Sequence, residues 1–74
     1  MTDIENEIKR VAKSMKAPIP IGQPFHQIKK LIEVLEERRR TQLKFTQERM
    51  KHWQKNYDSL ILARNQILNE TPNS

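Results

Sequence analysis

Apolar residues in the first sixteen positions recur at the spacing of one helical face. They fall at i, i+4, i+7, i+8 and i+11, as Ile4, Ile8, Val11, Ala12 and Met15. This spacing is the one-sided stripe of an amphipathic helix. Acidic residues open the segment and lysines close it, an order that complements the helix dipole. The pattern predicts a short helix over 3–16, within a first amphipathic segment of residues 1–17.

Prolines interrupt this pattern immediately afterwards. Pro18 and Pro20 lack the amide donors that a helix needs, and each disfavours the α conformation of the residue before it. Residues 18–24 are therefore expected to form an extended, Pro-rich connector. Its two isoleucines, Ile19 and Ile21, indicate that the segment packs on something, since a merely flexible linker would be rich in Gly and Ser. Pro24 suits the first position of a second helix.

The remainder of the chain has no residue that ordinarily breaks a helix. From Phe25 to Thr71 there are 47 residues without Pro or Gly, enough for a helix of about 70 Å. Apolar positions follow a heptad seam with alternating steps of three and four, except at 35–39–43, where two fours adjoin. Such a stutter is typical of a locally unwound coiled coil. We expect one long coiled-coil helix over 25–70 and a disordered tail over 71–74.

Composition narrows the fold class further. Of the 74 residues, 35% are hydrophobic and 31% are charged, with one Gly and no Cys. Small domains usually need a disulfide, a metal or a partner chain, and the absence of Cys excludes the disulfide. No apolar run approaches the ~20 residues of a transmembrane span, and the N-terminus has no apolar signal region. We expect an all-α protein, an oligomeric helical bundle or coiled coil, inside the cell in the cytoplasm or nucleus.

The predicted long helix has more apolar surface than the first helix can cover. A helix over 3–16 spans about 21 Å, roughly a third of the long helix, and would leave the face from Leu43 to Leu68 bare. A second copy or another protein is expected to cover that face. The expected partner interface comprises Phe25, Ile28, Ile32, Leu35, Leu43, Met50, Trp53, Tyr57, Leu60, Ile61 and Ile67.

Trp53 is the expected anchor of this interface. Trp and Tyr are enriched among the residues that carry binding energy, although ordinary coiled-coil packing would place Trp53 in the same position. In either case another helix must cover its ring. On this interpretation Trp53→Ala weakens assembly by about 2 kcal/mol or more.

Positive charge gathers in the middle of the chain. The net charge is +5, and residues 41–55 carry four basic residues against one acidic residue. Candidate contacts with nucleic acid or another anionic partner are Arg38, Arg39, Arg40, Lys44, Arg49, Lys51 and Lys55. A dimeric module that contacts nucleic acid through Arg38–Lys55 is the alternative function. The simpler interpretation is a solvated surface, because these charges point in several directions around a helix. A membrane-surface helix and a calmodulin-target-like peptide are weaker alternatives.

No constellation of catalytic or metal-binding residues is visible in the linear sequence. Glu48 is the nearest metal-ligand type at helical spacing from His52, and two ligands are too few for a metal site. The serines have no base beside them in sequence, and two helices are not expected to form a concave pocket. We therefore expect no catalytic site, metal, cofactor or small-molecule substrate. The predicted function is a non-enzymatic coiled-coil assembly or scaffold subunit that docks helix against helix in a homo- or hetero-oligomeric complex.

Overall fold

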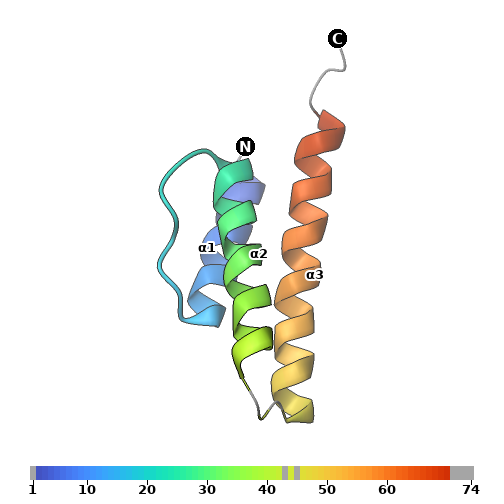
Figure 1. Cartoon of the computed structure of the whole chain (residues 1–74). Coiled ribbons are helices and arrows are strands. Elements are labelled where there is room, and N and C mark those ends of the chain that lie inside the picture. Colours follow the sequence, from blue (N-terminus) through green and yellow to red (C-terminus); the bar gives the residue numbers. More distant parts are fainter. Residues whose placement is uncertain (1, 43, 45, 71–74) are drawn as a thin grey trace.

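The computed structural model describes residues 2–42, 44 and 46–70, and three α-helices account for most of them. These are α1 (Thr2–Met15), α2 (Pro24–Thr41) and α3 (Gln47–Glu70). No strand occurs within the described ranges. α1 and α2 run in the same direction, and α3 runs antiparallel to both (Figure 1). Each helix contacts the other two, so the expected all-α fold is confirmed as a three-helix bundle.

α1 follows the predicted pattern closely. All five residues of the predicted stripe are buried, with Ile8, Val11 and Ala12 almost completely excluded from solvent. Their side chains share one face because residues three and four apart lie above one another on a helix. The acidic first turn and Lys13 in the last turn lie outside this face. The stripe is therefore the surface by which α1 packs onto α2 and α3.

α1 ends in a Schellman motif that has Lys16 in the left-handed conformation. The φ angle of Lys16 is 57°. The amide of Ala17 donates to the carbonyl of Ala12 at 2.9 Å. The amide of Lys16 donates to the carbonyl of Lys13 at 3.0 Å. This position usually holds Gly, because a side chain in the left-handed region costs about 1–2 kcal/mol. Ala17 also packs against the core, which fixes the direction in which the chain leaves α1.

The connector must return along the length of α1, because α2 begins beside the start of α1 (Figure 1). α1 is about 21 Å long, and the eight residues 16–23 reach roughly 26–29 Å only when extended. Pro18 and Pro20 hold the chain extended, as predicted. A hydrogen bond of 2.8 Å from the side-chain amide of Gln27 to the carbonyl of Pro20 ties the connector to α2.

The two isoleucines of the connector lie at the surface of the chain. Ile19 is 46% and Ile21 94% exposed, so neither belongs to the core of the bundle, and the expectation that the connector packs on something stays a prediction. The chain's one glycine, Gly22, has φ 134°, a conformation closed to ordinary side chains, and a Cβ there would lie 3.0 Å from the ring of His26. Gly22 thus makes the reversal into α2, which begins at Pro24 as expected.

The single helix expected over 25–70 is interrupted. α2 ends at Thr41, Gln42 has ordinary extended dihedrals, and its amide donates to the carbonyl of Arg38 at 2.9 Å. The hydroxyl of Thr46 then caps α3 by accepting from the amide of Arg49 at 3.2 Å. Neither Pro nor Gly is needed for such a turn. The physical reason for the turn is burial of apolar surface. When the chain turns back, α1 and α2 cover apolar residues of α3, and each large side chain that is buried stabilises the fold by about 1.5–3 kcal/mol.

The core lies where the three helices meet. α2 contributes Ile28, Leu31, Ile32 and Leu35, and α3 contributes Trp53, Asn56, Leu60 and Ala63. α1 and α2 of the same chain thus cover part of the apolar face that was expected to need another chain, including Trp53 and Leu60, whereas Leu62 and Leu68 stay exposed. Leu43 and the expected tail over 71–74 lie outside the described residues. Over the described ranges, no helix combines the length and apolarity needed to cross a membrane.

Lys16→Gly is predicted to stabilise the fold, because it removes the left-handed strain at the end of α1. We expect a gain of about 0.5–1 kcal/mol in the free energy of unfolding, measured by urea denaturation. Lys13→Gly is the matched control, an exposed lysine inside the helix, where Gly should cost about 1 kcal/mol. Equal destabilisation by the two variants would contradict the Schellman geometry.

Candidate functional site

Five of the eleven residues expected at a partner interface lie in the chain's own core. Ile28, Ile32, Leu35, Trp53 and Leu60 are buried by the other helices of the bundle. Met50, Tyr57, Ile61 and Ile67 are half-buried, and Phe25 is 39% exposed. The buried members are therefore unavailable to a partner unless the bundle opens, whereas the half-buried members border its surface.

Trp53 joins α3 to α2. Its indole N–H donates to the carbonyl of Leu35 at 2.8 Å, and only 8% of the residue is exposed. The ring stacks on Tyr57 with centroids 4.9 Å apart and planes 10° apart. The guanidinium of Arg39 lies 5.1 Å from the centre of the Trp53 ring, within cation–π range. Trp53 is thus an anchor between helices of one chain.

Two of the three consecutive arginines contact another helix of the bundle, and the third forms a surface ion pair within α2. Arg38 donates to the carbonyl of Met15 at 2.6 Å, which satisfies an acceptor at the end of α1. Arg39 covers Trp53, and Arg40 pairs with Glu37 at 2.6 Å. All three lie in the last turn of α2, where cations complement the helix dipole. The other four candidate contacts, Lys44, Arg49, Lys51 and Lys55, are exposed.

The fold gathers positive charge at one end of the bundle. The half that holds the ends of α1 and α2 and the start of α3 comprises residues 9–16, 33–42, 44 and 46–58 (Figure 1). It carries eleven basic residues against five acidic ones. The rest of the described chain carries three basic residues against four acidic ones. The basic end therefore carries +6 and the rest of the described chain −1, so the whole positive excess lies where α2 turns into α3.

A groove between α2 and α3 is open on the side that α1 does not cover. Its deepest part is a hollow of about 470 Å³ lined by Glu36, Arg39, Arg40, Trp53 and Tyr57, all from α2 and α3. Ile61, Arg64 and Leu68 follow Tyr57 at four, seven and eleven residues and so share its helix face. On α2, Phe25 and Lys29 precede Glu36 by eleven and seven residues and so share the helix face of Glu36. We call this surface the α2–α3 groove.

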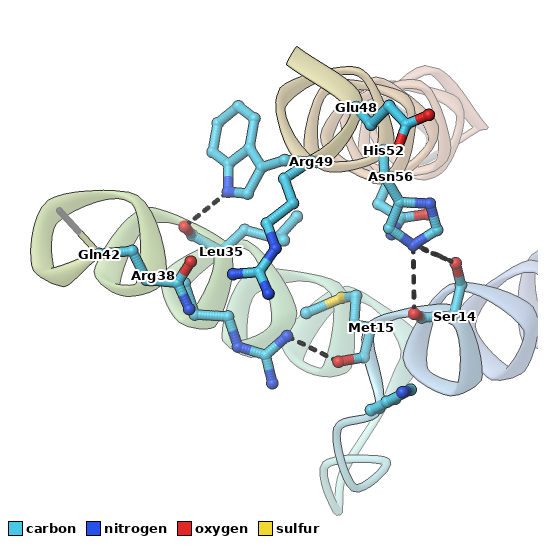
Figure 2. A pocket seen from close by; sticks show the side chains of 11 residues that line it. Ser14, Met15, Leu35, Arg38, Gln42, Glu48, Arg49, His52 and Asn56 are labelled. Carbon is cyan, nitrogen blue, oxygen red and sulfur yellow. Dashed lines mark hydrogen bonds between the residues drawn. The ribbon is translucent and has the colours of Figure 1, made fainter. Parts of the chain in front are cut away.

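A second hollow lies at the basic end and is lined by all three helices. Its volume is about 460 Å³, and its lining includes Ser14, Met15 and Lys16 from the end of α1, Leu35, Arg38 and Gln42 from α2, and Glu48, Arg49, His52, Trp53 and Asn56 from α3. Figure 2 shows the side chains of Arg38 and Arg49 reaching into this space from different helices. We call it the basic hollow. The expectation that no concave pocket would form is corrected, because it assumed only two helices.

Ser14 and His52, which are 38 positions apart in sequence, meet at the wall of the basic hollow. Nε2 of His52 lies 3.0 Å from the hydroxyl oxygen of Ser14 and 3.3 Å from its carbonyl oxygen. Depending on the ring tautomer, Nε2 donates to these oxygens or accepts from the hydroxyl. The amide of Asn56 also donates to the Ser14 hydroxyl, at 3.4 Å. Ser14, His52 and Asn56 therefore form a polar contact between the end of α1 and α3.

One further polar cluster ties α1 to α3. Arg10 donates through Nε to Glu7 at 3.3 Å, pairs with Glu7 again through Nη2, and reaches the hydroxyl of Ser59 on α3 at 3.2 Å. The hydrogen bonds from Arg10 are the main cause that lowers the pKa of Glu7, and the Glu7 carboxylate raises the pKa of Arg10. Within the described residues, no group of His, Asp or Glu side chains is arranged to hold a metal ion.

Trp53→Ala is predicted to act on folding and not only on assembly. Removing a buried aromatic ring and its hydrogen bond should lower the free energy of unfolding by about 3–5 kcal/mol, measured by urea denaturation. Tyr57→Ala removes the stacking partner but leaves the core filled, so we expect a smaller loss of about 1–2 kcal/mol. A Trp53→Ala variant as stable as the wild type would show that the ring is not buried.

Glu7→Gln is predicted to change stability in a pH-dependent way. Because the folded state lowers the pKa of Glu7, its ion pair stabilises above the unfolded pKa of about 4.3 and is lost as the pH falls through the folded value. Wild type should therefore exceed Glu7→Gln in unfolding free energy at pH 7, and the difference should vanish by about pH 2. When Arg10 is already replaced by Gln, Glu7→Gln should change the free energy of unfolding little at either pH. A full change in that background would exclude the Glu7–Arg10 ion pair as the cause of the pH dependence.

Comparison of the chain with protein-family models, with curated proteins and with solved structures finds no match in any of the three. Function is therefore inferred from the geometry of the two hollows and from the surface around them.

Proposed function

We propose that the chain is a non-enzymatic assembly subunit that binds an amphipathic helix of another protein in the α2–α3 groove. The observation that carries this proposal is the apolar stripe along the groove, where Tyr57 and Ile61 are half-buried and Leu68 is 53% exposed. α1 fills one side of the α2–α3 hairpin, and a fourth helix on the other side would complete a four-helix bundle. An intracellular setting remains part of this proposal.

Charge favours a different, acidic partner over a second copy. The hollow is lined by Arg39 and Arg40 against Glu36, and Lys29 and Arg64 lie further along the same helix faces. Arg40 is already paired with Glu37, so Lys29, Arg39 and Arg64 are the cations without an ion pair to a described residue. Two copies of a chain with net charge +5 would also repel each other. A partner helix with glutamates beside its apolar stripe would pair with these cations, and electrostatic complementarity of this kind gives specificity.

Arg64 gives this surface an unpaired group. Its Nε is the one buried side-chain nitrogen or oxygen among the described residues that has no hydrogen-bond partner. Such a group costs free energy, because burial removes its water without supplying an acceptor. A carboxylate docked in the α2–α3 groove would provide acceptors for the guanidinium.

The test uses two designed helical peptides with the same apolar stripe, one flanked by glutamates and the other by lysines. We expect the full chain to bind the acidic peptide at least tenfold more tightly, measured by isothermal titration calorimetry. Leu68→Glu should weaken this binding by about tenfold or more, because it places a charge beside the apolar stripe.

Leu62→Glu is the matched control. Leu62 is also on α3 and is 69% exposed, but it lies on the α1 side, against the hollow formed with Asp3 and Glu7. Its substitution should leave peptide binding unchanged. Equal binding of the two peptides, or equal effects of the two leucine variants, would contradict the proposal. Self-association that Leu68→Glu abolishes would instead assign the groove to a second copy.

The basic end of the bundle supports a second proposal, contact with nucleic acid. Lys44, Arg49, Lys51 and Lys55 are exposed. Arg39 and Arg40 are exposed as well but contact Trp53 and Glu37, and Arg38 is half-buried and donates to Met15. Binding to duplex DNA or RNA should weaken steeply with salt, because phosphate contacts release counterions. Binding that is absent, or unchanged between low and high salt, would exclude this function.

A further inference from the structure

The basic hollow brings two unpaired guanidinium groups together. Arg38 comes from the last turn of α2 and Arg49 from the first turn of α3, and neither forms an ion pair with a described carboxylate. Glu48 is the one acidic residue in the lining, against Lys16, Arg38 and Arg49. Two like charges directed into one concavity repel each other, and an anion between them would relieve that repulsion.

One of the two guanidinium groups is fixed in position. One nitrogen of Arg38 is held by the carbonyl of Met15 at 2.6 Å, which leaves its other N–H groups to bind a ligand in the hollow. His52 is held against Ser14 on the neighbouring wall (Figure 2). A guanidinium held in this way matches the geometry of phosphate or carboxylate oxygens and binds them by charge-assisted hydrogen bonds.

Part of the lining of the hollow is apolar. Met15, Leu35 and Trp53 line it together with the cationic side chains. Its volume of about 460 Å³ lies within the range of roughly 300–1,000 Å³ that is typical of small-molecule sites. An apolar base with a few converging polar groups is also the usual composition of such sites. The arrangement therefore fits a ligand with an anionic head and a small apolar body.

We infer that the basic hollow is a binding site for an organic anion, a phosphate, sulfate or carboxylate group carried on a short apolar body. Arg38 and Arg49 hold the oxyanion, Lys16 adds charge at the rim, and the apolar body lies over Met15 and Trp53. The α2–α3 groove is on another side of the bundle, and of the residues that line the two hollows only Trp53 is shared. The inference is thus independent of helix docking.

The test uses Trp53, the only tryptophan of the chain, as the reporter. Hexyl phosphate is titrated into the full chain and the Trp53 fluorescence is followed, with inorganic phosphate and hexanol in parallel. We expect a saturable change with hexyl phosphate, at least tenfold weaker binding of inorganic phosphate, and no saturation with hexanol. Backbone amide shifts measured by NMR should move at residues 16, 38, 49 and 52, and not at 62 or 68.

The decisive variant is Arg49→Gln. The Arg49 side chain is exposed and has no hydrogen bond to a described residue, so its removal should leave the fold intact by circular dichroism. We expect it to weaken hexyl phosphate binding at least tenfold. Lys51→Gln removes the same charge from α3 outside the hollow, and Arg40→Gln removes a charge on the groove side of Trp53. Both controls should bind within twofold of the wild type.

Several outcomes would overturn the inference. They are the absence of a saturable change, equal binding of hexanol, or equal weakening by Arg49→Gln and Lys51→Gln. Leu68→Glu, which is expected to impair peptide docking, should leave hexyl phosphate binding unchanged. Loss of peptide docking and loss of anion binding can therefore be told apart.

Discussion

The packing of α3 back onto α1 and α2 is the interaction on which the rest of the structure depends. Trp53 and Leu60 of α3 bury their side chains against the other two helices, and the indole N–H of Trp53 is satisfied by the carbonyl of Leu35. Without this packing, α2 and α3 would have no reason to turn at residues 42–46, and α1 would have only α2 to cover its stripe. Both hollows are also formed by this packing, since each is lined by α2 and α3 together.

The basic residues are constrained by the same geometry. The last turns of α1 and α2 lie at one end of the bundle, where unpaired carbonyls and the negative ends of the helix dipoles favour cations. Arg38 satisfies a carbonyl at the end of α1, His52 contacts Ser14 there, and Arg39 covers the Trp53 ring. Much of the charge that suggests nucleic acid in the linear sequence therefore stabilises helix ends. Arg49 is different, because its side chain has no such contact and lies in a concave site.

The sequence was informative wherever structure is set locally. The stripe of α1 predicted its buried face, the prolines predicted the extended connector, and Pro24 predicted the start of α2. The turn after Thr41 was missed because only Gly and Pro were considered as helix breakers. Two signals pointed to it: three arginines that suit the last turn of a helix, and Thr46, a good N-cap residue. The stutter at 35–39–43 lies just before this turn, but it was interpreted as a defect in a continuous coiled coil.

The basic hollow could not be found from spacing, because its members come from segments far apart in the chain. Ser14 meets His52 only because α3 runs antiparallel to α1, and Arg38 reaches Met15 only because α2 runs parallel to it. The partner interface stays a prediction for a related reason. The heptad pattern marks apolar faces, but it cannot say whether the same chain or another chain covers them.

The central claim, that α2 and α3 form a hairpin within one chain, can be tested by a single distance. Spin labels at Lys29→Cys and Asn65→Cys, on exposed positions of α2 and α3, can be measured by double electron–electron resonance, with unlabelled chain in excess to suppress distances between molecules. A hairpin places the two labels about 10–25 Å apart, because packed helices lie roughly 8–10 Å from axis to axis and the labels add their own length. A distance near 54 Å, the length of 36 residues of continuous helix, would contradict the hairpin and restore the long helix.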